Sequence, residues 1–330
     1  MKRLGIVDAL RGIATLAVCF FHLNYHVVSH LPSELAKSLL SYGWLGVEVF
    51  FVISGFVIPY SMHRAGYRLP DYGLFVVKRV ARVDPPYFIA IALTLFLSWL
   101  SAKAPGYRGE RFQFSTTQLL FHVAYLNAFY PEEWYQTAFW TLAIEFQFYL
   151  LVGLIFPLIA HERPVPRLSI FAILGAASLF IPQQHAFIPC WLFLFMLGIL
   201  AFQRHAGLVG GAGFWVILVL LVLGAWHNLG WLNAIVGAAA ACAIVFLNTT
   251  NKVLLFFGSL SYSLYLIHGP IATRIFNIGG RYFNGLWADV LLFCFAVSVC
   301  IGVAFLLHRY VEVPAMRWSS KIKYRHRPSH

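Results

Sequence analysis

Two ionisable residues interrupt the first apolar stretch of this sequence and could do chemistry there. Within residues 8–26, DALRGIATLAVCFFHLNYH, Arg11 lies in the first turns of a predicted helix and His22 in its second half. Eleven residues separate them, about three turns, so their side chains share one face roughly 16 Å apart along the axis. A guanidinium in this position can bind an anion, and an imidazole can exchange a proton.

Two acids and a second histidine lie at a similar depth in other apolar stretches. Counted at about 1.5 Å per residue from the predicted helix ends, Glu48, Glu145 and His268 lie near the level of His22. Buried charges need partners, so we expect these four side chains to share a polar cavity in the outer half of a membrane. A stabilising network without activity is the alternative. Three hydroxyl groups could hydrogen-bond a substrate there or simply bond between helices: Ser54, Tyr262 and Ser263.

Basic residues cluster on the opposite side of the predicted membrane, before the third apolar stretch. This segment contains Lys78, Arg79 and Arg82, and its two arginines share a face if it is helical. They could be ordinary cytoplasmic-side charge. With Arg11 nearby, they could instead form a clamp for phosphate groups. A basic site on one side and a His/Glu layer nearer the other fit a ligand with a phosphorylated head and a long thin arm, and acyl-CoA has that shape.

The elements that hold these residues are predicted to be membrane helices. Of the 330 residues, 60% are hydrophobic and only 11% are charged, against about 25% charged in soluble domains. This composition indicates an all-α, polytopic membrane helix bundle. The basic and apolar N-terminus resembles a signal sequence, but Arg11 interrupts it, so we expect a retained first helix. About ten transmembrane helices are predicted, over 6–27, 39–60, 84–102, 138–160, 168–182, 187–203, 212–227, 231–248, 253–276 and 287–310.

The distribution of basic residues predicts that both termini are cytoplasmic. With the N-terminus inside, 18 Lys and Arg residues fall in inside segments and 6 in outside segments, as the positive-inside rule requires. The net charge of +12 is therefore mostly topological, and anionic lipid rather than nucleic acid explains the basic tail. We predict a transmembrane domain over 1–316 and a basic cytoplasmic tail over 317–330. In the long outside loop, STTQLLFHVAYLNAFY predicts a helix lying in the membrane interface.

The same residues raise two alternatives, a metal site and a transport function. No metal is predicted, because His22 and His26 lie four residues apart but lack an acid or third ligand nearby. A proton-coupled transporter of a small solute or of an acylated glycan precursor is the alternative function, with the buried acids and histidines as a proton relay. Such folds often contain inverted repeats, and this sequence has no convincing repeat.

Seven short motifs are spread over nearly the whole chain. They are ALRGIATLAVCFFH, GVEVFFVISGF, KRVARVDPPY, WTLAIEFQFY, LGIL, GSLSYSLYLIHGP and RYVEVPAMRW. Each is loose, but together and in this order they resemble the acyltransferase 3 family of integral membrane proteins. The resemblance implies ten core helices and transfer of an acyl group, with acetyl expected, from cytoplasmic acyl-CoA. The implied acceptor is a hydroxyl of an extracytoplasmic or lipid-linked carbohydrate, or a small molecule such as a macrolide.

The resemblance also implies where the protein works and how it handles its donor. The expected location is the bacterial cytoplasmic (inner) membrane. Many relatives carry a further extracytoplasmic hydrolase-like domain, and without one we expect direct transfer to the acceptor. Acetyl-CoA is the expected acyl donor, with its phosphates at Arg11, Lys78, Arg79 and Arg82.

A mechanism follows for the two residues predicted to be catalytic, His22 and Glu145. We expect His22, kept neutral by burial, to accept the proton of the acceptor hydroxyl as that oxygen attacks the thioester. Glu145 would orient the imidazole and stabilise the imidazolium, as the acid does in a hydrolytic triad. Glu48 or His268 could orient the ring instead, because the sequence does not give the distances between helices.

Overall fold

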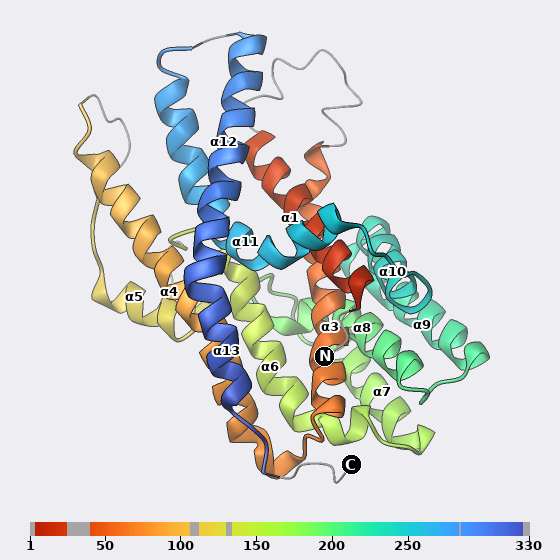
Figure 1. Ribbon diagram of the computed structural model, residues 1–330. Coiled ribbons are helices and arrows are strands. Elements are labelled where there is room, and N and C mark those ends of the chain that lie inside the picture. Colours follow the sequence, from red (N-terminus) through yellow and green to blue (C-terminus); the bar gives the residue numbers. More distant parts are fainter. Residues whose placement is uncertain (1–3, 25–39, 106–111, 130–133, 284, 326–330) are drawn as a thin grey trace.

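The protein is a bundle of helices, as its apolar pattern predicts (Figure 1). This computed structural model describes residues 4–24, 40–105, 112–129, 134–283 and 285–325, and within these ranges it contains no β-strand. The helices are α1 (Gly5–Asn24), α3 (Gly46–Arg64), α4 (Tyr72–Ala102), α5 (Thr116–Val123), α6 (Phe139–Ile159), α7 (Pro164–Phe180), α8 (Leu192–His205), α9 (Gly211–Leu229), α10 (Trp231–Phe246), α11 (Lys252–Gly279), α12 (Leu286–Leu307) and α13 (Val313–Lys321).

The predicted membrane helices correspond in order to α1, α3, α4 and α6 to α12. Within the described residues, eight helical segments are long and apolar enough to cross a membrane, while α7 and α10 are shorter apolar helices. The boundaries agree to within about five residues except at two helices: α3 begins at Gly46 rather than near residue 39, and α4 begins at Tyr72 rather than near residue 84. For α4, the reason is the composition of its first turns. Hydropathy misses this start because the basic residues before position 84 are helix formers but are not apolar. The predicted limits at 25–27 and 39 lie outside the described residues.

The chain remains helical beyond the predicted end of the last membrane helix. A π-helical turn, His308–Glu312, follows α12 directly and leads into α13. Such turns change the direction of the side chains around a helix and occur often at functional sites. The first residues of the predicted tail therefore belong to α13, and its last five, 326–330, lie outside the described residues. The short helix predicted in the long loop is also present, as α5.

Helices α1 and α11 cross in close contact because glycines face each other. A Cβ atom on Gly258 of α11 would lie only 2.0 Å from the carbonyl oxygen of Asp8, and one on Gly12 would lie 2.8 Å from the amide nitrogen of Gly258. Side chains are therefore excluded at this crossing. The tight crossing fixes the relative positions of His22 on α1 and His268 on α11.

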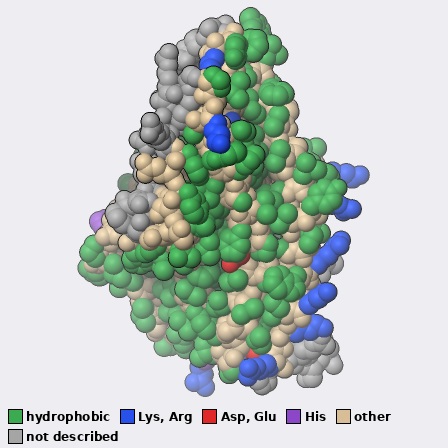
Figure 2. Space-filling view, turned by 90° about the vertical axis from the view of Figure 1, so that its left-hand side faces the viewer, with side chains coloured by type: hydrophobic (Ala, Val, Ile, Leu, Met, Phe, Trp, Pro, Cys, Tyr) green, Lys and Arg blue, Asp and Glu red, His purple; other side chains and the backbone are tan. Residues whose placement is uncertain are grey.

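The outer surface of the bundle is apolar, as helices in lipid require. In the most apolar stretch of the segment that contains α8, 72% of the residues are buried inside the protein. The corresponding share is only 22% in α9, and it is also 22% in the continuous segment formed by α12 and α13. The peripheral helices therefore direct most of their apolar side chains outward. Figure 2 shows hydrophobic side chains over the middle of one face, with Lys and Arg side chains along its lower right edge and at its upper end.

Candidate active site

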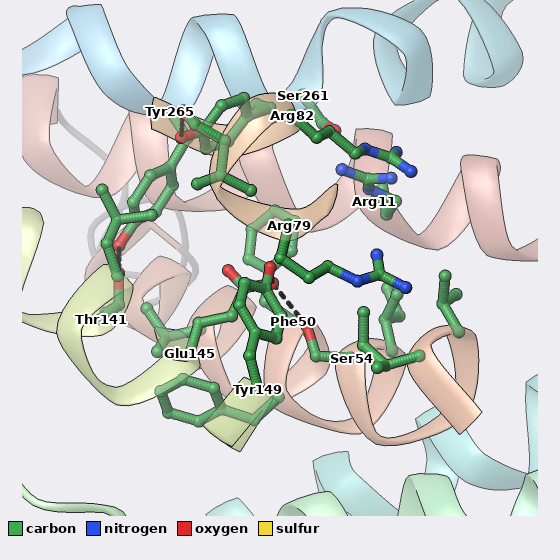
Figure 3. A pocket seen from close by; sticks show the side chains of 18 of the residues that line it. Arg11, Phe50, Ser54, Arg79, Arg82, Thr141, Glu145, Tyr149, Ser261 and Tyr265 are labelled. Atoms are coloured by element: carbon green, nitrogen blue, oxygen red, sulfur yellow. Dashed lines mark hydrogen bonds between the residues drawn. The ribbon is translucent and has the colours of Figure 1, made fainter. Parts of the chain in front are cut away.

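An arginine-lined cavity, called here the arginine cavity, opens between α1, α3, α4, α6 and α11 (Figure 3). Its empty volume is about 960 Å³ with the open space at its mouth included, which is the size of a small-molecule site. The guanidinium groups point toward one end of it, and Thr141 and Tyr265 lie at the other end. Its ionisable lining residues are Arg11, Arg79, Arg82, Glu145, Tyr149, Tyr262, Tyr265 and Glu312.

None of the three guanidinium groups in this cavity forms an ion pair with a carboxylate among the described residues, although Glu145 and Glu312 also line the cavity. Nη2 of Arg79 donates to Oγ of Ser61 at 2.7 Å, and its guanidinium lies 5.7 Å from the ring centre of Tyr149. Among the described residues, the side chains of Arg11 and Arg82 have no hydrogen bond, and no carboxylate pairs with any of the three. Like charges that converge in a shielded space require an anion for stability. The arrangement therefore suits a phosphorylated ligand.

Lys78, the fourth predicted member of the phosphate clamp, points elsewhere. Its Nζ donates to the carbonyl oxygen of Ile322 at 3.2 Å and lies 5.3 Å from the ring centre of Tyr324. Oγ of Ser319 donates to the backbone carbonyl of Lys78 at 2.9 Å. Lys78 thus fastens α13 and the segment after it to α4. Its predicted role in phosphate binding has no support from this geometry, whereas the three arginines do converge.

Glu145 lies in the arginine cavity with partners of its own. Oγ of Ser54 donates to its Oε1 at 3.1 Å, and the hydroxyl of Tyr149 donates to the same oxygen. Nearby, the hydroxyl groups of Thr141 and Tyr265 hydrogen-bond each other at 2.7 Å (Figure 3). Thr141 and Tyr265 make the end of the cavity away from the guanidinium groups polar but closely hydrogen-bonded, whereas Glu145 is bonded to Tyr149, whose ring lies against Arg79.

The two histidines meet in a second cavity, called here the histidine cavity. Nδ1 of His22 lies 2.9 Å from Nε2 of His268, although 246 positions separate them in the sequence. This cavity is lined from α1, α11 and the segment directly before α6, and His22 is exposed to it. Its polar lining residues are His22, Gln136, Thr137, His268 and Thr273.

The hydrogen bonds of His268 assign the proton positions on both rings when both are neutral. Its Nδ1 faces the carbonyl oxygens of Tyr265 at 2.8 Å and Leu264 at 3.2 Å. Carbonyl oxygens only accept, so Nδ1 of His268 carries the proton and its Nε2 is an acceptor. Nδ1 of His22 must then donate to that Nε2. In this tautomer the Nε2 of His22 carries a lone pair and has no hydrogen-bond partner among the described residues, as a general base requires.

The four buried groups predicted to share one cavity are divided in the structure. Glu145 lines the arginine cavity, and the two histidines line the histidine cavity. Glu48 lines neither; it is 1% exposed, and its Oε2 has no hydrogen-bond partner among the described residues. The expectation of one shared cavity is therefore corrected, and the catalytic roles assigned to these residues stay predictions.

The three hydroxyl residues predicted near the site also separate. Ser54 and Tyr262 line the arginine cavity, where the Tyr262 hydroxyl donates to the carbonyl oxygen of Val83 at 2.8 Å. Ser263 is fully buried and donates to Oε2 of Glu312 at 2.7 Å. Among the described residues, no group of three His, Cys, Asp or Glu side chains could hold a metal ion.

Several residues of the two cavities were not predicted from the sequence. Glu312 lines the arginine cavity and accepts from Nδ1 of His308 at 2.9 Å. It is the acid in the closing motif RYVEVPAMRW, and the acid itself was the available signal. Thr141, Tyr149 and Gln136 carry no such signal, because hydroxyl and amide side chains are common in membrane helices and loops.

The fold and the two cavities define the class of protein. It is a multi-pass integral membrane protein in which α1 contributes Arg11 to an arginine cluster completed by α4 and His22 to a histidine pair completed by α11. A family model described as an acyltransferase domain matches residues 4–309. The chain belongs to this family, acyltransferase 3, and the resemblance seen in the seven motifs is confirmed.

Relatives with assigned names are acyltransferases from bacteria. O-acetyltransferase OatA of Staphylococcus aureus (strain NCTC 8325 / PS 47) is 26% identical over 357 aligned residues, which cover 93% of this chain and 56% of OatA. Acyltransferase MdmB of Streptomyces mycarofaciens is 26% identical, with 96% of this chain and 92% of MdmB covered. Peptidoglycan O-acetyltransferase OatA of Listeria monocytogenes is 29% identical, over 46% of this chain and 24% of OatA.

The extent of these matches differs between the relatives. The chain spans 56% of the length of the staphylococcal OatA and nearly the whole of MdmB, at 92%. No solved structure is similar to this chain.

Proposed function

We propose that this protein is an acyl-CoA-dependent O-acyltransferase that moves an acyl group, with acetyl expected, to a hydroxyl of an extracytoplasmic or lipid-linked carbohydrate. The family supports acyl transfer, and the names of the OatA relatives support an O-acetyl product. The observation that carries the proposal is the cluster of Arg11, Arg79 and Arg82, which forms no ion pair with a carboxylate among the described residues. Its member Arg11 lies on the same helix, α1, as His22.

The three arginines are proposed to hold the phosphates of acetyl-CoA. Guanidinium groups bind phosphate oxygens in pairs, which gives both affinity and orientation. Arg11 and His22 lie about 16 Å apart along α1, a distance of the same order as a pantetheine arm. The arm would extend past Thr141 and Tyr265, which line the arginine cavity and hydrogen-bond Ala138 of the histidine cavity.

His22 is proposed to act as the general base. Its Nε2 accepts the proton of the acceptor hydroxyl while that oxygen attacks the thioester carbonyl carbon. The new C–O bond forms as the C–S bond breaks, and the proton then passes from His22 to the leaving thiolate, so the products are an ester and a thiol. His268 holds the ring of His22 in the required tautomer. Glu145 lines the arginine cavity rather than the histidine cavity and hydrogen-bonds Ser54 and Tyr149, so its proposed role is to shape the donor cavity.

The orientation in the membrane follows from charge. We propose that both termini lie in the cytoplasm, because the positive-inside count favours that side and places the arginine cluster where acyl-CoA is found. The histidine cavity then opens toward the outer face of a bacterial inner membrane. The basic residues from 317 onward would bind anionic lipid head groups, and no nucleic-acid partner is proposed.

The test is transfer by the purified protein. Wild-type protein in detergent is incubated with radiolabelled acetyl-CoA and a panel of neutral and anionic glycans, a peptidoglycan fragment and a macrolide. We expect label in at least one acceptor, and we expect His22→Ala to lose it without a lower melting temperature. His227→Ala is the matched control, since His227 is exposed on α9 and lines neither cavity. Uptake of solute into vesicles without any label transfer would support the transporter instead.

A further inference from the structure

The histidine cavity contains a polar side chain whose hydrogen-bonding groups are unused. Both Nε2 and Oε1 of Gln136 are shielded from solvent and have no hydrogen-bond partner among the described residues. An amide offers two donors and one acceptor. Leaving such a group buried and unpaired costs about 1–3 kcal/mol. A native protein tolerates this cost where an ordered water or a ligand supplies the missing partners, and the position of this amide at a cavity beside the histidine pair favours a ligand.

The backbone on both sides of Gln136 is held in place, so its amide has a defined position. The backbone N–H of Tyr135 donates to Nε2 of His122 at 3.1 Å, and the two rings stack with centroids 4.1 Å apart. On the other side, Thr141 donates to the carbonyl oxygen of Ala138 at 2.9 Å. These contacts hold the segment before α6 against α5 and against α6 itself. The Gln136 side chain is therefore presented by a fixed frame.

A glycine of α11 makes room for the amide beside the histidine pair. A Cβ atom on Gly269 would lie 2.6 Å from Nε2 of Gln136, so a larger residue would displace the amide. Gly269 directly follows His268, which hydrogen-bonds His22. The amide of Gln136 thus borders the same cavity as the proposed base.

The lining of the histidine cavity also indicates the charge of its ligand. Its described lining contains no Lys, Arg, Asp or Glu residue; besides Gln136 and the histidines it offers the hydroxyl groups of Thr137 and Thr273. An anionic ligand would lose its hydration here without gaining a counter-charge. A neutral molecule with several hydroxyl groups would find partners for each of them. The arginine cavity, in contrast, suits the phosphorylated donor.

We propose that the histidine cavity is the acceptor site, and that Gln136 selects a neutral polyol with a hydroxyl group next to the one that is acylated. This inference rests on the proposed acyl transfer. The attacked hydroxyl donates to Nε2 of His22, and the neighbouring hydroxyl exchanges hydrogen bonds with the amide of Gln136. A simple alcohol fills the cavity less well and leaves the amide unpaired, so it is a poorer acceptor.

The experiment uses Gln136→Leu, which keeps a similar shape but removes the amide. Steady-state transfer is measured with acetyl-CoA and neutral methyl glycosides, and for the best of these also with its monodeoxy derivatives. We expect Gln136→Leu to raise the KM of the glycoside at least 10-fold and to leave the KM of acetyl-CoA unchanged. One monodeoxy derivative should be at least 10-fold poorer for the wild type and equal to its parent for the variant.

Stability separates this role from a structural one. Replacing an unpaired buried amide by an apolar group of similar shape is neutral or stabilising, so the melting temperature of Gln136→Leu should not fall. Gln183→Leu is the control, because its Nε2 donates to backbone carbonyls away from both cavities.

The outcomes are distinguishable. Unchanged glycoside kinetics in Gln136→Leu, or a wild-type preference for anionic acceptors, would overturn the inference while acyl transfer stands. A melting temperature several degrees lower would assign Gln136 to folding and overturn it as well. No transfer from acetyl-CoA to any acceptor by the wild type would overturn the proposed function, and the inference with it.

Discussion

Replacing His268 by Asn or by Gln separates the two hydrogen bonds that its ring makes. An Asn side chain places its amide near the former Nδ1, so it can still donate to Tyr265, but it removes the Nε2 atom that accepts from Nδ1–H of His22. A Gln side chain reaches the former Nε2 position, where its Oε1 can accept that N–H. If His268 fixes the tautomer of His22, Gln should preserve activity and Asn should not.

The size of the effect can be bounded from the contact itself. A neutral hydrogen bond contributes about 1 kcal/mol net, so losing the 2.9 Å contact between the rings sets a lower limit of about 5-fold on kcat. Complete loss of general base catalysis sets an upper limit of about 10,000-fold. We expect kcat to fall about 10- to 1,000-fold in His268→Asn and less than 10-fold in His268→Gln. The KM of acetyl-CoA should not change, since His268 does not line the arginine cavity.

The assay is radiolabel transfer by purified variants, with melting temperatures measured in the same detergent. Equal kcat values for His268→Asn and His268→Gln, with both proteins folded, would refute the tautomer reasoning. A parallel rise in the KM of acetyl-CoA would instead place His268 in donor binding.

Three further perturbations test the donor cavity, the helix crossing and the loop before α6. Arg82→Ala should raise the KM of acetyl-CoA about 10- to 150-fold at unchanged kcat, because a charge-assisted bond contributes about 1.5–3 kcal/mol. Arg204 lies outside both cavities, so the control variant Arg204→Ala should leave both KM and kcat unchanged. Equal effects of the two substitutions on KM would contradict phosphate binding by the arginine cluster. Gly258→Ala should destabilise the protein by about 1–3 kcal/mol, since its Cβ would lie 2.0 Å from the carbonyl oxygen of Asp8; an unchanged melting temperature would show that the crossing is looser than described. Burial lowers the pKa of His122 below its ordinary value of 6.5. The unfolded chain therefore protonates His122 more readily than the folded protein does. The free energy of unfolding should be highest above pH 6.5 and should fall as the pH drops below it. The protection factors of amides in the segment before α6, which are exchange rates corrected for the intrinsic pH dependence, should then fall below pH 6.5, and protection factors that do not change with pH would contradict this role.

The sequence predicted the depth of the histidines in the membrane well, but it did not predict which side of a helix faces which cavity. Hydropathy located the apolar helices because lipid requires about 20 apolar residues for a span, and a rise of about 1.5 Å per residue placed His22 and His268 at one level. Their hydrogen bond agrees with that estimate. Glu145 was assigned to the same level, but the rotation of α6 turns it into the arginine cavity instead. Rotation about a helix axis depends on packing against neighbours, which a single sequence does not give.

Contacts between distant segments were the other part that the sequence could not supply. Lys78 belongs to the same basic run as Arg79, yet it binds Ile322 near the C-terminal end of the described chain. Glu312 enters the arginine cavity from a π-helical turn, and no local pattern distinguishes such a turn from an ordinary helix. Nothing in the sequence distinguishes Gln136 from other glutamines; its unpaired amide beside the histidines is a feature of the tertiary structure alone.

A structure of the protein with a non-hydrolysable acetyl-CoA analogue tests the central claim most directly. We expect density for its phosphates against Arg11, Arg79 and Arg82, and its acyl carbonyl within about 6 Å of Nε2 of His22, close enough for a hydroxyl between them. Phosphates bound away from the arginines, or an acyl carbonyl that stays on the arginine side of Tyr265, would contradict a donor path from one cavity to the other.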